Sequence, residues 1–168
     1  MTTGATAASF DEVVASNERR LLRLALMLSG GVHSAEDLVQ AVLARAHQRW
    51  ERIGVLEHPE AYLRVMVVNE FLSWRRLLRN REVPVAEIVE PAPVEDVSSR
   101  QAQRDAAWRL LATLPRQQRA VLVLRYYEDL PDDEIAAVLR CSASTVRSNA
   151  ARGLASLRAV VPAPNEES

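Results

Sequence analysis

Residues 130–148 have the sequence LPDDEIAAVLRCSASTVRS, which predicts two helices joined by a very short turn. The small Ala136 lies where the two helices have to cross closely. Ser142 stands at the N-cap of the second helix, because its hydroxyl can accept a hydrogen bond from an otherwise unsatisfied backbone amide. A plain helical hairpin inside a bundle is the alternative, but the cap, the short turn and the small residue together favour a helix-turn-helix. This motif places its second helix in the major groove of DNA.

The charges of the C-terminal part support binding to DNA. The sequence has four arginines and no carboxylate over residues 135–161, and its acids gather just before, over residues 128–134. One face of this part is therefore expected to be electropositive, although the formal net charge of the chain is −1. All 21 basic residues are arginine, whose planar fork of donors suits phosphates and guanine edges. A GC-rich genome that favours arginine codons is the simpler explanation of that bias.

Residues 10–81 show a continuous helical pattern, in which apolar residues recur at three- and four-residue spacing. Gly30 and Gly31 predict the C-terminal cap of a first helix. Ser34 is the predicted N-cap of a second helix, and Pro59 is expected to open a third after a loop over residues 54–59. Since no segment of useful length alternates with period two, this part is predicted to be all-α.

The predicted third helix carries aromatic residues beside arginines. Four arginines and no carboxylate occur over residues 71–81, and Tyr62, Phe71 and Trp74 belong to the same helix. Aromatic rings can stack on unpaired bases while guanidinium groups hold the phosphates, so the pattern is typical of binding to single strands. The alternative is a helix whose Phe71 and Trp74 are buried in the core and whose basic end is solvated.

The whole chain is predicted to be all-α, with two small helical domains joined by a flexible linker. The expected domains span residues 10–82 and 106–161, and the second is the helix-turn-helix domain. Three prolines among acids and serines make residues 83–105 unable to bury much apolar surface, which predicts the linker. A surface loop packed on one domain is the alternative for this stretch. Residues 162–168 are expected to form a disordered tail.

Several classes of function find no support in the sequence. His33, His47 and His58 do not have metal-ligand spacing, and neither a glycine-rich phosphate loop nor a nucleophile motif occurs. We therefore expect no enzymatic activity, no metal and no cofactor. The single Cys141 excludes an internal disulfide and suits a reducing compartment. Because residues 1–9 do not resemble a signal peptide and no apolar run approaches the ~20 residues needed to cross a bilayer, we expect a soluble cytoplasmic protein without membrane insertion.

Three motifs carry a resemblance to a known family. They are AEDLVQ at residues 35–40, YLRVMVVNEFLSWRR at residues 62–76 and LPRQQRAVL at residues 114–122. With its order of helical domain, acidic linker and helix-turn-helix domain, the chain resembles an extracytoplasmic-function (ECF) sigma factor of bacterial RNA polymerase, close to the actinobacterial SigE-like group. The resemblance covers nearly the whole chain, from about residue 10 to residue 160. The run VNEFLSWRR is specific to the family, whereas a helix-turn-helix alone is not.

The resemblance implies three groups of binding residues. The group that docks on the beta-prime clamp helices of the polymerase core is Asp37, Gln40, Leu43 and Arg45. The group that melts and recognises the minus-ten promoter element comprises the loop over residues 54–59 with Arg64, Asn69, Ser73, Trp74, Arg75 and Arg76. The group on the recognition helix for the minus-thirty-five element is Ser142, Ser144, Thr145, Arg147, Ser148, Asn149 and Arg152. Strand opening also needs a pocket for an extruded base.

The implied function is that of a transcription initiation factor with no chemistry of its own. It would bind the RNA polymerase core through the beta-prime clamp helices and the beta flap, bridge the two promoter elements and aid strand opening. An anti-sigma factor is a further partner that the resemblance leaves open. The alternative is a stand-alone helix-turn-helix regulator, which would bind its DNA without the polymerase.

Two residues depart from the family pattern. Pro131 stands where Ser or Thr is usual, so a reciprocal capping box with Glu134 is lost, although proline can still start a helix. Arg140 replaces the usual glycine in the turn. A left-handed backbone at that position would cost a non-glycine residue about 1 kcal/mol.

Overall fold

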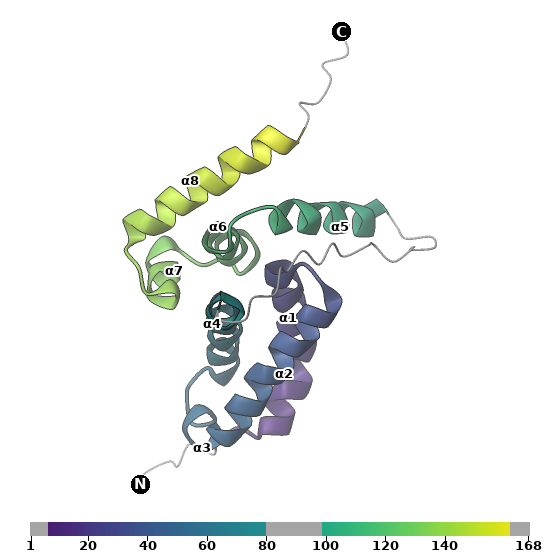
Figure 1. Ribbon diagram of the computed structural model, residues 1–168. Helices are drawn as coiled ribbons and strands as arrows, with labels where there is room; N and C mark the ends of the chain where they lie inside the picture. The colour runs from purple at the N-terminus through teal and green to yellow at the C-terminus, as the bar shows by residue number, and fades with distance from the viewer. Residues whose placement is uncertain (1–6, 80–98, 162–168) are drawn as a thin grey trace. The chain divides into compact units, whose positions relative to one another are not determined.

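The computed structural model describes residues 7–79 and 99–161, which are helical apart from short connections (Figure 1). No strand occurs in these two ranges, in agreement with the predicted all-α class. The chain divides into two compact units, Met1–Glu87 and Ile88–Ser168. Residues 83–98 of the predicted linker and the predicted tail over residues 162–168 lie outside the described residues.

The N-terminal unit consists, in its described part, of α1 (Phe10–Ser29), α2 (Val32–Gln48), the short α3 (Trp50–Ile53) and α4 (Pro59–Arg79). The helices α1, α2 and α4 contact one another and lie side by side in Figure 1. Their shared core consists of fully buried apolar side chains, namely Leu21, Leu24, Leu28, Leu38, Val42, Leu63, Val67, Val68 and Phe71. Each such side chain stabilises the unit by about 1.5–3 kcal/mol relative to its exposed state.

Two glycines set the boundary between α1 and α2. Gly30 is left-handed with φ 79°, and its N–H donates to the carbonyl of Leu26 at 2.8 Å, which confirms the predicted cap. The N-cap of α2 is Gly31, so the prediction of Ser34 at this position is wrong. Extended backbone at Gly31 (φ −144°, ψ 144°) lets the helix begin at Val32, which places Ser34 inside its first turn.

The C-terminal unit consists, in its described part, of α5 (Ser99–Ala112), α6 (Arg116–Leu122), the π-helical turn η1 (Val123–Tyr127), α7 (Asp132–Leu139) and α8 (Ala143–Val160). Helix α8 packs against α6 and α7. The core of the unit includes the buried side chains of Val121, Val123, Ile135 and Val146. Gly153 lies where α8 comes close to α6, because a Cβ atom there would be 3.0 Å from Leu122 Cδ1.

Two features of this unit differ from the sequence-based expectation. Helix α5 begins at Ser99, so residues 99–105, which were expected in the linker, are helical. The run SRQAQRD follows the proline-rich stretch and consists mainly of residues with fair to good helix propensity, which explains the earlier start. The sequence also predicts one helix from Arg116 to Tyr127. The α-helix instead changes to a π-helical turn at Val123, where the N–H of Glu128 donates to the carbonyl of Val123 at 3.1 Å.

Arg119 of α6 forms hydrogen bonds with the backbone at the end of α5. Its guanidinium donates to the carbonyls of Ala112 and Leu114, each at 2.9 Å. Ala112 is the last residue of α5 and Leu114 lies just beyond it, where backbone acceptors lack helical partners. Burial, followed by the charge of Arg116, lowers the pKa of Arg119 to about 10.

Candidate nucleic-acid interface

The turn between α7 and α8 has the compact geometry of a helix-turn-helix. The C-cap of α7 is Arg140, whose backbone is left-handed (φ 53°, ψ 47°). The N–H of Cys141 donates to the carbonyl of Ala136 at 3.0 Å and so satisfies an acceptor at the end of α7. The left-handed turn therefore forms with arginine in place of glycine, at a cost of about 1 kcal/mol.

Ser142 caps helix α8, as predicted. Its Oγ accepts a hydrogen bond from the N–H of Thr145 at 3.1 Å and lies 2.9 Å from the Thr145 hydroxyl. Val146, in the same turn, is fully buried in the core of the unit. The first turn of α8 is therefore held on both its polar and its apolar side.

The outer face of α8 carries polar and basic side chains near the N-terminus of the helix. Among the predicted recognition residues, those exposed to solvent are Ser142, Ser144, Thr145, Arg147, Ser148 and Arg152, and Asn149 is partly buried. The opposite face of the helix buries Val146, Ala150 and Gly153. The structure thus brings these predicted residues together at one helix, and most of them are accessible to a ligand.

The predicted aromatic and basic face of α4 is divided between core and surface. Phe71 is buried at 1% exposure, so the core alternative is right for this residue. The predicted minus-ten residues that are partly buried or exposed on the same helix are Arg64, Asn69 and Ser73. The side chains that lie outside the described part are those of Trp74, Arg75 and Arg76, although α4 continues through Arg79.

The residues of α2 that the resemblance assigns to polymerase docking differ in exposure. Asp37 and Gln40 are exposed, and Leu43 is partly buried. Arg45 forms an ion pair with Glu70 of α4, whose side chain is only 7% exposed. Arg45 therefore joins α2 to α4 and compensates the charge of a buried carboxylate.

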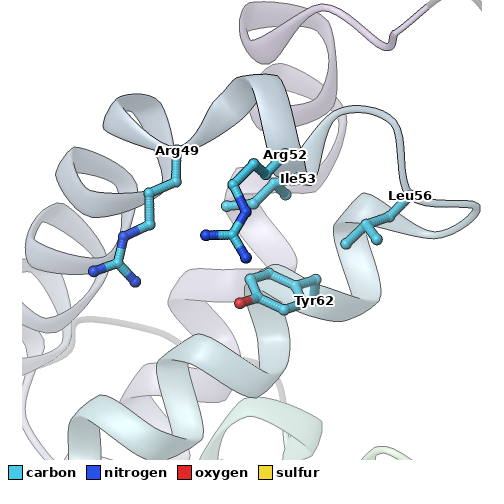
Figure 2. Close-up of a pocket in the computed structure, with 5 residues that line it drawn as sticks. All are labelled: Arg49, Arg52, Ile53, Leu56 and Tyr62. Carbon is cyan, nitrogen blue, oxygen red and sulfur yellow. The ribbon is translucent and has the colours of Figure 1, made fainter.

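A pocket of about 160 Å³ opens between α3, the loop that follows it and α4 (Figure 2). The residues that line it are Arg49, Arg52, Ile53, Leu56 and Tyr62. In Figure 2 the guanidinium of Arg52 lies between Arg49 and the ring of Tyr62. The pocket therefore combines two cationic donor groups with an aromatic ring and a small apolar wall.

Arg49 and Arg52 are candidate residues that the sequence pattern alone does not mark. The only hint in the sequence is that the two arginines stand three residues apart, shortly before Gly54. That spacing gains meaning only from the fold, because the short helix α3 turns the chain so that both side chains line the same pocket as Tyr62.

The described ranges contain neither a candidate metal site nor a candidate membrane-spanning helix. Within residues 7–79 and 99–161, no group of three or more His, Cys, Asp or Glu side chains could hold a metal ion. None of the helices in those ranges is long and apolar enough to cross a membrane.

Comparison with known proteins identifies the family. Residues 13–81 match Sigma-70 region 2, and residues 104–157 match Sigma-70, region 4. The RNA polymerase sigma-E factor of Streptomyces coelicolor is 38% identical over 149 residues, which cover 89% of this chain and 84% of that protein. The ECF RNA polymerase sigma factor SigM of Mycobacterium tuberculosis is 30% identical, with 89% of this chain and 75% of that protein covered. The chain belongs to the ECF sigma factors.

The fold of this ECF sigma factor also occurs in solved structures. The sigma factor RpoE of Bartonella quintana, solved in complex with the anti-sigma factor NepR, has a TM-score of 0.64 at 25% identity and covers 89% of this chain and 94% of that one. CnrH, solved in complex with the cytosolic domain of CnrY, has a TM-score of 0.58 at 22% identity, over 90% of this chain and 86% of that one. The likeness to CnrH shows the fold alone.

Each of the two regions of the sigma factor lies within one of its two units. Region 2 contains the pocket and the exposed face of α2, and region 4 contains the helix-turn-helix. A stand-alone helix-turn-helix regulator is not favoured, because such a protein has no use for region 2. Sigma factors are transcription initiation factors rather than catalysts.

Proposed function

We propose that this sigma factor directs RNA polymerase to promoters by recognising two DNA elements, one with each unit. The observation that carries the proposal is the capped helix α8, whose exposed N-terminal half presents Arg147 among small hydroxyl side chains. A helix held in this way can enter the major groove with its first turns against the base edges. An arginine there can donate to two acceptor atoms of one guanine.

For the minus-thirty-five element, we assign contacts to the outer face of α8. The residues placed against DNA are Ser142, Ser144, Thr145, Arg147, Ser148, Asn149 and Arg152. Ser142 has the additional role of holding the helix start through Thr145. Arg147 is the proposed base contact, and Arg152, further along the helix, is a proposed phosphate contact. The backbone amides and the dipole at the start of α8 add attraction for a second phosphate.

For the minus-ten element, we assign capture of an extruded base to the pocket beside α3. Its aromatic ring, from Tyr62, can stack on a base, and guanidinium groups donate hydrogen bonds but accept none. A base that presents acceptor atoms at its edge fits this chemistry, and the two arginines also attract the strand's phosphates. The opened strand would continue along α4, where the assigned residues are Arg64, Asn69, Ser73, Trp74, Arg75 and Arg76.

For the polymerase, we assign docking to the outer face of α2 and to the C-terminal unit. Asp37, Gln40 and Leu43 would contact the beta-prime clamp helices, with Arg45 acting through its hold on α4. An exposed acid and amide on one helix face suit a basic partner surface. The C-terminal unit would contact the beta flap. Because promoter DNA and RNA polymerase are in the cytoplasm, we place this sigma factor there as well.

An anti-sigma factor is a further proposed partner. The support is that the RpoE structure, which shares the fold at 25% identity, contains the anti-sigma factor NepR. Such a partner would act by covering the surfaces that polymerase or promoter DNA needs.

The experiment that tests the proposed function is transcription in vitro with purified core polymerase over a promoter library. We expect initiation only in the presence of the sigma factor, at promoters that share two sequence elements. In a parallel gel-shift experiment, specific binding to duplex promoter DNA should require core polymerase. Specific binding by the chain alone, together with no initiation when core polymerase is added, would instead support the stand-alone regulator.

A further inference from the structure

The segment just before α1 is tied to the turn that follows α3. The N–H of Ala8 donates to the carbonyl of Gly54 at 3.0 Å. In return the indole Nε1–H of Trp50 donates to the carbonyl of Ala8 at 2.6 Å. These two hydrogen bonds connect positions that lie far apart in the sequence, so they exist only in the folded unit. We call residues 8–10 the N-terminal strap.

Aromatic packing reinforces the strap. The ring of Phe10 meets the ring of Trp50 edge to face, with centroids 5.1 Å apart, and meets His47 in the same manner at 4.9 Å. Gly54 leaves no spare room at this junction, because a Cβ atom there would lie 2.7 Å from Trp50 Nε1 and 3.1 Å from the carbonyl oxygen of Ala8. The strap therefore fixes the position of both ends of α3.

Helix α3 needs such an anchor. It has only 4 residues, and a helix of that length does not form by itself in water. Of the two arginines that line the pocket, Arg52 lies in α3 with Trp50, and Arg49 is the N-cap residue of that helix. Where their guanidinium groups point is therefore decided by how α3 is held.

We propose that the N-terminal strap, acting through Trp50 and Gly54, is a positioning device for the base pocket of region 2. It holds α3 so that Arg49 and Arg52 face Tyr62 across the pocket, ready to receive the extruded base. This inference rests on the proposed function of the pocket. The positioning residues are Ala8, Phe10, Trp50 and Gly54. Of these, only Gly54 belongs to a segment that the family resemblance assigns to DNA binding, namely the loop over residues 54–59. Their effect is confined to base capture, so duplex recognition by α8 does not depend on them.

The test uses the full chain with core polymerase on promoters whose minus-ten region is already opened by mismatches. A set of templates lacks the base at one minus-ten position each. With the wild-type chain, removal of the captured base should weaken complex stability about fivefold or more, as expected for one stacked base. The Trp50→Phe variant keeps an aromatic ring but loses the N–H to Ala8. It should bind the complete and the base-less template with affinities within about twofold, since a misplaced pocket gains little from the base.

Two further variants separate the strap from general damage to the fold. Ala8→Pro removes the N–H that Ala8 donates to Gly54 and should have the same effect as Trp50→Phe, because both variants release α3. Trp108→Phe makes the same chemical change on α5 of the other unit and should keep the wild-type dependence on the captured base. Thermal unfolding of each variant shows that it is folded at the temperature of the assay.

The outcomes distinguish the strap from the pocket. If the wild-type chain depends on one base and Trp50→Phe and Ala8→Pro show the same dependence, the strap is not a positioning device, while the pocket assignment stands. If no minus-ten base affects the wild-type complex, the pocket assignment fails and the strap proposal is overturned with it.

Discussion

Arg125 and Asp132 join the π-helical turn η1 to the first turn of α7. Arg125 Nε donates to Asp132 Oδ1 at 3.0 Å, and Arg125 Nη2 donates to the same oxygen. This side-chain hydrogen bonding raises the pKa of Arg125 above its usual value, so the guanidinium stays charged. Both side chains are about one quarter exposed, which reduces the screening of the pair by water. The start of the helix-turn-helix is therefore fixed by a charged contact from the preceding turn.

Replacing Asp132 by Asn should destabilise the C-terminal unit. The variant keeps an acceptor oxygen but loses the charge that faces Arg125, so the free energy of unfolding should fall by about 1 kcal/mol more than in a matched control. That control is Asp133→Asn, which loses an exposed acid from the same first turn and the same interaction with the helix dipole. Urea unfolding followed by circular dichroism measures both. Equal losses in the two variants would mean that the contact with Arg125 adds nothing.

Replacing Ser142 by Ala should remove the N-cap of α8. The N–H of Thr145 would lose its acceptor, and the free energy of unfolding of the C-terminal unit should fall by about 1 kcal/mol. The control is Ser148→Ala, at an exposed position away from the ends of the same helix. It should leave the free energy of unfolding within about 0.5 kcal/mol of the wild type. A Ser142→Ala variant as stable as this control would show that the cap hydrogen bond does not stabilise the protein.

Replacing Arg140 by Gly should stabilise the C-terminal unit by about 0.5–1 kcal/mol. The φ of 53° at this position strains a residue with a Cβ atom, and glycine removes that strain. Asn, which tolerates the left-handed region better than Arg, should give a smaller gain in the same direction. The measurement is the midpoint of thermal unfolding. A lower midpoint for Arg140→Gly would show that the Arg140 side chain contributes more than the strain costs.

Replacing Arg147 by Ala should change which promoters the sigma factor selects. If Arg147 binds a guanine, its loss should cost about 1–3 kcal/mol on promoters that carry the preferred base and relax the preference at that position. Arg158→Ala, in the last turn of α8, is the matched control and should leave the preference unchanged. Competitive binding of the holoenzyme to a promoter library measures both effects. Uniform weakening on all sequences by Arg147→Ala would assign it to a phosphate instead.

Replacing Arg45 by Ala should destabilise the N-terminal unit, because it leaves the carboxylate of Glu70 buried without its charged partner. Arg45 is itself half exposed, so we expect a loss of about 1–3 kcal/mol rather than the larger loss seen for fully buried pairs. In the double variant Arg45→Ala with Glu70→Gln, the second change should recover part of this loss. Additive effects in this double-mutant cycle, measured by urea unfolding, would mean that the two residues are not coupled.

The elements that the sequence predicts well depend on local chemistry. Gly30 ends α1 and Ser142 caps the start of α8 because of interactions within a few residues of each, so the local sequence is enough to predict both helix boundaries. The prediction of Ser34 as an N-cap shows the limit of this reasoning. Gly31, three residues before Ser34, adopts the extended conformation that an N-cap needs. Residue type alone ranks serine above glycine as an N-cap, so the backbone conformation rather than the side chain decides where α2 begins.

The elements that the sequence does not predict depend on contacts between distant residues. The indole of Trp50 finds its acceptor at Ala8, which lies in another part of the chain, and α3 follows from that contact. The family resemblance assigns Arg45 to polymerase docking, but the packing of α2 on α4 pairs it with Glu70. Phe71 fitted both a stacking surface and a core by its spacing, and only the packing of α1, α2 and α4 decides for the core.

Gly153 has a consequence for attempts to engineer promoter choice. A Cβ atom at this position would stand 3.0 Å from Leu122 Cδ1, so a larger residue would crowd the contact between α8 and α6. New specificities should therefore be sought by exchanging side chains on the outer face of the first turns of α8, with its backbone kept in place. Libraries that randomise the whole helix would also change Val146, Ala150 and Gly153, which pack in the core of region 4, whereas libraries that keep these three residues would vary the exposed face.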